Sequence, residues 1–336
     1  MTAGTTGPER SVGSGGVTGS LPAGAPAGGS GDSGEGRTIT VRVRRSARGR
    51  PEGGAGSRAG LRAGVGPEGG EATEHTEQRY RVWAFPRMSV LDALFAIQRE
   101  QDRSLSFRYS CRLGMCGTCA MVIDGREGLA CQTLVEHLPG DEVDLRPLGH
   151  LPVLKDLVVD LEPFFDRYRA VKPHFVPRGD RAPGEAPAAP QVIKQGEGER
   201  RWVDPALGCI TCGICHSACS VVGLNERFPG PAAFNRAFTL TNDVRDGARD
   251  ERLALAGDAD GVWRCHQLFS CASACPRHLV PTQAIRELRL DAGGRMDSPL
   301  TAPLRWLRRR MLPVVEPVVE PAAEGPAGGA DAAQER

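Results

Sequence analysis

Residues 209–219 read CITCGICHSAC, and residues 265–276 read CHQLFSCASACP. The first segment has the spacing C-x2-C-x2-C-x3-C, and the second repeats it with Leu268 in place of the second cysteine. Runs of this kind wrap cubic iron–sulfur clusters, and in paired runs the fourth cysteine of each binds the cluster of the other run. The two segments therefore predict a domain that holds two clusters.

This crossing rule assigns a set of thiolates to each cluster. A [4Fe–4S] cluster has a complete set in Cys209, Cys212, Cys215 and Cys275. The second cluster is left with Cys219, Cys265 and Cys271. An apolar Leu268 cannot replace the missing thiolate, so we expect the iron at that corner to be absent and the cluster to be [3Fe–4S]. The alternative is a labile four-iron cluster with water at the open corner.

A further cysteine group lies upstream, in the segment LSFRYSCRLGMCGTCAMVIDGREGLACQT (105–133). Its spacing is C-x4-C-x2-C with a distant fourth member, which is the plant-type [2Fe–2S] pattern. The expected ligands are Cys111, Cys116, Cys119 and Cys131. Gly114 and Gly117 suit a loop that needs positive φ and close backbone approach, and Arg112 adds positive charge beside an anionic cluster. A structural zinc site is the alternative, although zinc sites usually pair two short cysteine knuckles.

Composition narrows the class of protein. The chain has 336 residues, and its 42 basic and 41 acidic residues almost cancel, which argues against a nucleic-acid partner. No apolar run is long enough to span a membrane, and the N-terminus lacks the apolar core of a signal peptide. In a cytosolic chain, eleven cysteines are better explained by metal clusters than by disulfides.

Alternating and periodic apolar residues predict the elements around the first cysteine group. RTITVRVRR (37–45) and RYRVWAF (79–85) are expected to pair as a hairpin whose turn has expanded into a disordered insertion, residues 46–77. A helix should follow, capped by Ser89 with Asp92 three residues on.

Two more regions carry patterns. A second hairpin is expected from Ala120–Ile123 and Gly128–Thr133 around the Asp124-Gly125 turn. Residues 154–169 have a helical apolar period, with a break expected near Pro163.

The fold class that follows is α+β. We expect an N-terminal β-grasp plant-type [2Fe–2S] ferredoxin domain, followed by an all-α domain of the two-cluster bacterial ferredoxin type. The expected division is a disordered tail (1–36), the [2Fe–2S] domain (37–150), a connecting helix and linker (151–200), the helical domain (201–297) and a mostly disordered tail (298–336).

The three cysteine groups in this order resemble the iron–sulfur subunit of succinate dehydrogenase and fumarate reductase, over roughly residues 37–292. The segment PLGHLPVLKDLVVDLEPFFDRYRAVKP (147–173) is similar to the family's inter-domain connection. The resemblance implies an electron-transfer subunit of a tricarboxylic acid cycle enzyme, with no substrate-converting site of its own. The implied partners are a flavoprotein that carries FAD, a cytochrome b-type membrane anchor and a quinone. The implied location is peripheral, on the cytoplasmic side of the cell membrane, held through partner subunits.

The quinone end rests on fewer residues. His266 matches a residue that the family places near the quinone, and Leu268 and Ser220 are expected close by. Ser220 stands where the family commonly has proline, and Leu224 stands about where many members have tryptophan. These departures keep open a relay that serves another flavoprotein with a non-quinone acceptor. A zinc-stabilised interaction protein is a further alternative.

Overall fold

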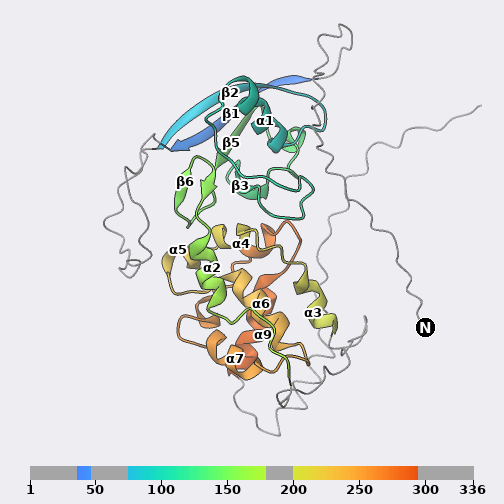
Figure 1. Ribbon diagram of the computed structural model, residues 1–336, viewed down its shortest axis with the longest axis vertical. Coiled ribbons are helices and arrows are strands. Elements are labelled where there is room, and N and C mark those ends of the chain that lie inside the picture. The colour runs from blue at the N-terminus through green and yellow to red at the C-terminus, as the bar shows by residue number, and fades with distance from the viewer. Residues whose placement is uncertain (1–35, 47–74, 179–199, 294–336) are drawn as a thin grey trace, which may run out of the picture. The chain divides into compact units, whose positions relative to one another are not determined.

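The computed structural model describes residues 36–46, 75–178 and 200–293 of the chain (Figure 1). The predicted tails, apart from Gly36, lie outside the described residues, as do most of the predicted insertion and linker. Residues 294–297, which we assigned to the helical domain, lie outside them as well.

The N-terminal part is a five-stranded mixed sheet in the order β2-β1-β5-β3-β4. Its strands are β1 (Arg37–Ser46), β2 (His75–Ala84), β3 (Ala120–Ile123), β4 (Arg126–Leu129) and β5 (Glu142–Arg146). β1 pairs in parallel with β5, and the other pairs are antiparallel. Helix α1 (Val90–Glu100) lies near the paired strands β2, β1 and β5 in Figure 1, and buries an apolar face. The expected β-grasp domain is confirmed.

The sequence signals for α1 are confirmed in detail. Ser89 and Asp92 form a capping box, in which the Asp92 N–H donates to the Ser89 hydroxyl (3.2 Å) and the Ser89 N–H donates to the Asp92 carboxylate (3.1 Å). Both bonds satisfy backbone donors that a helix start leaves without partners. A 3₁₀ turn, η1 (Val135–His137), follows β4.

The first hairpin is longer than its sequence pattern indicated. β1 and β2 pair from Arg37↔Ala84 to Ser46↔His75, so Ser46 and residues 75–77 belong to strands. The predicted insertion, 46–77, was therefore too wide at both ends, because polar residues at the end of a ladder pair as well as apolar ones do. Residues 47–74 are outside the description.

The segment after the sheet corrects another prediction. Residues 154–159 do not continue a helix but form β6 (Val153–Lys155) and β7 (Val158–Val159), joined at Asp156. The Asp156 carboxylate is buried and accepts the backbone N–H of Ser46 (3.2 Å) and of Ser106 (2.9 Å), which fixes this turn against the sheet. Helix α2 (Glu162–Arg169) begins afterwards with Pro163 in its first turn, where proline starts a helix rather than breaking one.

The C-terminal part is helical, as expected. It contains α3 (Arg200–Leu207), α4 (Ile214–Ser217), α5 (Ser220–Leu224), α6 (Pro231–Thr241), α7 (Arg249–Ala256), the 3₁₀ turn η2 (Val262–Arg264), α8 (Ser270–Ser273) and α9 (Pro281–Gly293). α6 is buried along most of its length and contacts α3, α7 and α9. Phe228, Phe234 and Ile285 fill this core.

A buried ion pair ties α7 to the segment that follows α2. The Arg252 guanidinium and the Asp246 carboxylate are both fully buried and bonded to each other. Arg252 also donates to the carbonyls of Lys172 (2.8 Å) and His174 (2.6 Å), while Asp246 accepts the N–H of Val176 (3.0 Å). Burial acts to raise the pKa of Asp246, but the hydrogen bonds from Arg252 and the backbone outweigh it and leave that pKa lowered.

We predict that Asp246→Ala destabilises the folded chain by about 3–5 kcal/mol, because it leaves the Arg252 charge buried and unpaired. Urea unfolding of the cluster-loaded chain, followed anaerobically by circular dichroism, should show a lower midpoint for this variant than for wild type. Asp250→Ala is the control, since that side chain is 96% exposed, and it should cost less than about 1 kcal/mol. Equal losses in the two variants would contradict the role given to the buried pair.

Candidate iron–sulfur sites

Three cysteines of the first group, Cys111, Cys116 and Cys119, lie in the loop between α1 and β3, and Cys131 follows β4. The Cys111 thiol accepts the backbone N–H groups of Leu113 (3.4 Å) and Cys116 (3.3 Å), and the Cys116 thiol accepts that of Thr118 (3.5 Å). The pKa of Cys116 is lowered to about 6, with a hydrogen bond from the Thr118 side chain as the largest cause. Because the thiolate is the form that binds metal, this loop is prepared for the role.

Cys119 and Cys131 meet at the base of the same loop. Cys119 is only 3% exposed, and burial raises its pKa to about 12, with the neighbouring Cys131 and Cys116 thiols acting in the same direction. A lone thiolate is disfavoured there, and a cationic iron core would offset that penalty. The structure therefore brings the four predicted [2Fe–2S] ligands close together, and their thiols suit the binding of an iron–sulfur cluster.

The glycines of this loop have the backbone conformation expected of them. Gly114 and Gly117 both have φ +72°. A Cβ atom on Gly117 would lie 2.5 Å from Cβ and 3.0 Å from Cα of Cys212, whereas one on Gly114 would meet the side chain of Gln132. The absence of a side chain at Gly117 thus lets the first cysteine loop touch the second.

Arg112 also has a left-handed backbone, with φ 59°. Its guanidinium lies 4.6 Å from the ring centroid of Phe95 and 5.6 Å from that of Tyr109. These cation–π contacts hold the positive charge of the loop on an aromatic surface.

The second group consists of the first three cysteines of the first run, Cys209, Cys212 and Cys215, and the last cysteine of the other run, Cys275. The pKa of Cys212 is raised to about 11, chiefly by burial, with the nearby Cys275 and Cys209 thiols acting in the same direction. Burial raises the pKa of Cys215 well above the usual value, and the thiols of Cys212, Cys209, Cys271 and Cys275 act in the same direction. Cys275 therefore lies with the three cysteines of the first run, although more than fifty residues separate them.

The third group surrounds one pocket. Cys219, Cys265 and Cys271 all line it. Burial raises the pKa of Cys271 to about 11, opposed by a hydrogen bond with Thr282 and reinforced by Cys219 and Cys265. The thiols of this set interact with one another across helices α5 and α8, as shared ligands would.

The predicted quinone-proximal residues border the same pocket. His266, Leu268 and Ser220 line it, and Leu268 is 64% exposed. The adjacent Gln267 and Phe269 have φ 56° and 62°, so the loop that carries Leu268 is held in an uncommon conformation for non-glycine residues. The structure brings these residues together at one edge of the third group.

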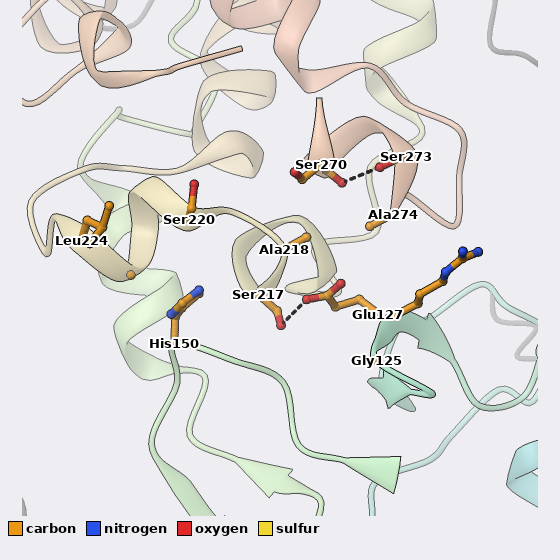
Figure 2. A pocket seen from close by; sticks show the side chains of 12 residues that line it. Gly125, Glu127, His150, Ser217, Ala218, Ser220, Leu224, Ser270, Ser273 and Ala274 are labelled. Atoms are coloured by element: carbon orange, nitrogen blue, oxygen red, sulfur yellow. Dashed lines mark hydrogen bonds between the residues drawn. The ribbon is translucent and has the colours of Figure 1, made fainter. Parts of the chain in front are cut away.

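A second, open pocket of about 990 Å³ lies beside α5 and β4. Figure 2 shows Glu127, His150 and Ser220 around it, with Leu224 at its rim. The Ser217 hydroxyl accepts the N–H of Gly149 (2.7 Å) and donates to Glu127 (3.0 Å). The Leu224 side chain is 83% exposed.

Sequence reasoning missed three residues near the thiols. His216 is buried beside Cys215, and burial, followed by the charge of Arg167, lowers its pKa to about 4, so its ring is neutral at pH 7. Ser217 links α4 to β4, and Thr282 contacts Cys271. No local pattern marks any of them, because each acts through a contact that is distant in sequence.

No helix in the described ranges is long and apolar enough to cross a membrane. Within the same ranges, no three or more His, Cys, Asp or Glu side chains gather closely enough to hold one single metal ion.

Each of the two domains matches a known family of iron–sulfur domains. Residues 65–166 match the family model of a 2Fe-2S iron–sulfur cluster binding domain, and residues 205–279 match that of a 4Fe-4S dicluster domain. The chain is 35% identical over 221 residues to the fumarate reductase iron–sulfur subunit of Haemophilus influenzae, covering 63% of this chain and 85% of the relative. It is 39% identical over 201 residues to the succinate dehydrogenase iron–sulfur subunit of Paracoccus denitrificans, covering 60% and 74%.

A solved structure agrees with these matches. A chain of the Mycobacterium smegmatis Sdh1 complex in the apo form superposes with a TM-score of 0.60 at 27% identity, over 78% of this chain and 98% of that one. With the order of the two domains and the extent of the sequence matches, the chain belongs to the family of iron–sulfur subunits of succinate dehydrogenase and fumarate reductase.

Proposed function

We propose that this subunit relays electrons between an FAD-carrying flavoprotein, where succinate and fumarate interconvert, and a membrane quinone. One [2Fe–2S], one [4Fe–4S] and one [3Fe–4S] cluster would supply the one-electron redox centres. The observation that carries the proposal is the crossed grouping of thiols: Cys219 lines one pocket with Cys265 and Cys271, whereas Cys275 lies near Cys209 and Cys212 of the first run.

The grouping supports the ligand assignment made from spacing. We assign the [2Fe–2S] cluster to Cys111, Cys116, Cys119 and Cys131. We assign the [4Fe–4S] cluster to Cys209, Cys212, Cys215 and Cys275. We assign the [3Fe–4S] cluster to Cys219, Cys265 and Cys271.

The three-iron assignment departs from the general description of the dicluster domain, which refers to four-iron clusters. Two such clusters would take eight thiolates, and the two runs together contain seven cysteines. Leu268 occupies the eighth position and offers an apolar side chain to the pocket. We therefore infer that this corner carries no iron.

The quinone end is proposed from the residues beside the third group. His266 and Ser220 place polar side chains at the edge of the thiol-lined pocket, next to Leu268. We infer a cytochrome b-type membrane anchor at this end, which would hold the subunit peripherally on the cytoplasmic side of the membrane. Ser220 and Leu224 differ from the residues common in the family, and this favours, as a second candidate, the same relay with a non-quinone acceptor.

The first prediction concerns the open corner. We expect Leu268→Cys to supply the fourth thiolate, so that the oxidised [3Fe–4S] EPR signal disappears and bound iron rises from about nine to about ten atoms per chain. EPR of the oxidised, purified protein and iron quantification measure both changes.

The matched control is Leu224→Cys, which adds a thiol to an exposed position outside the thiol-lined pocket. It should leave the signal and the iron content unchanged. A wild-type protein that never shows the oxidised [3Fe–4S] signal would refute the assignment, and a colourless protein that contains zinc would refute the relay.

The second prediction tests the crossing. Cys275→Ser should damage the [4Fe–4S] centre, and Cys219→Ser should damage the [3Fe–4S] centre, while the [2Fe–2S] signal persists in both. EPR of each variant, oxidised and reduced, separates the three centres. If each substitution instead damages the cluster of its own run, the thiols do not cross.

Close contact between Gly117 and Cys212 supports the order of transfer. The loop of the first thiol group meets a thiol-bearing residue of the second group with no side chain between them. We infer that electrons pass between the two domains at this contact.

The third prediction therefore compares two glycines with the same φ. In the assembled complex with the flavoprotein, Gly117→Ala should separate the loops and lengthen the delay between reduction of the [2Fe–2S] centre and reduction of the [3Fe–4S] centre. The delay is measured by rapid-freeze EPR after the complex is mixed with succinate. Gly114→Ala carries the same backbone cost, about 1–2 kcal/mol, but the nearest atoms to its added Cβ belong to the Gln132 side chain and not to the second thiol group. The contact between the two loops is then kept, and the delay should stay unchanged. Equal delays in the two variants would show that the contact does not carry the transfer.

A further inference from the structure

One thiol of the third group is hydrogen-bonded to a side chain from another helix. The Cys271 Sγ atom in α8 and the Thr282 Oγ1 atom in α9 are 3.2 Å apart. Both residues are buried, with exposed fractions of 7% for Cys271 and 2% for Thr282. Thr282 is the second residue of α9 and lines the same pocket as the three thiols.

The direction of this hydrogen bond follows from the chemistry of a bound thiolate. A cysteine that binds iron has lost its proton, so the sulfur can only accept and the Thr282 hydroxyl must donate. The 3.2 Å separation of the two atoms is within hydrogen-bond range for such a donor. Thr282 therefore favours negative charge on this sulfur.

A donor to a ligand sulfur has a greater effect on the reduced cluster than on the oxidised one. Reduction adds an electron whose charge is shared with the ligand sulfurs, so a hydrogen bond to sulfur stabilises the reduced state more. Cys219, by comparison, is approached by the backbone N–H groups of Val221 and Val222, which no side-chain substitution removes.

We propose that Thr282 is a positioning residue that raises the reduction potential of the [3Fe–4S] centre by donating a hydrogen bond to Cys271. The inference rests on the proposed function, because it requires Cys271 to be a ligand of that cluster. It gives α9 a role in setting the driving force for the last transfer within the chain.

The test is an EPR-monitored redox titration of the assembled complex that contains wild type, Thr282→Val or Thr282→Ser. The Val variant keeps the shape of the side chain and loses the donor, so its [3Fe–4S] midpoint potential should fall. The Ser variant keeps the donor, so its potential should stay at the wild-type value. The [2Fe–2S] and [4Fe–4S] potentials should not move in either variant.

Ser273→Ala is the matched control. Its hydroxyl is also close in sequence to Cys271 and Cys275, but it donates to the Ser270 carbonyl (3.2 Å), so its removal should leave the [3Fe–4S] potential unchanged. An unchanged potential in Thr282→Val, or an equal fall in Thr282→Ser, would overturn the proposal.

Two further outcomes are distinguishable. If Thr282→Val and Thr282→Ala both assemble without the [3Fe–4S] centre, Thr282 is needed to build the site rather than to set its potential, and the proposal is wrong. A wild-type protein without the oxidised [3Fe–4S] signal would instead contradict the proposed function, before any variant is compared.

Discussion

Crowding of thiols in a buried space is the constraint on which the rest of this structure depends. Burial raises the pKa of Cys119, Cys212 and Cys271, and neighbouring thiols raise each of them further. Folding alone therefore brings together groups that repel one another once ionised. Bound iron would compensate for that repulsion, and in metal-dependent domains metal binding and folding are coupled.

The sequence predicted local features better than the course of the chain between them. The signals at Ser89, Gly114 and Gly117 are local, and the structure reproduces them. The prediction of a helix over residues 154–159 was wrong because the buried carboxylate of Asp156 stabilises a turn there. Its hydrogen-bond partners lie some 50 and 110 residues away in sequence, so the apolar periodicity could not reveal them. Thr282 and Ser217 were missed for the same reason, since their partners lie on other elements.

The two domains are in direct contact and are not only joined by a linker. Ile214 and Ala232 of the helical part pack in the same apolar core as the sheet and α1, and Ser217 bonds to both Gly149 and Glu127. These contacts lie close to Cys215 and Cys219 in sequence, so the apolar core that supports the first thiol group also supports the others. A substitution in this shared apolar core would therefore affect the surroundings of more than one thiol group.

The end of the first hairpin has a practical consequence for labelling the protein. Ser46 and His75 are register partners, and Ser46 is further held by the carboxylate of Asp156. The two ends of the connection between them are therefore held at a fixed separation by the strand pairing. The entropic cost of closing such a connection grows only slowly with its length. The connection is therefore a natural insertion point for an affinity peptide or a fluorophore, placed away from the thiols in sequence.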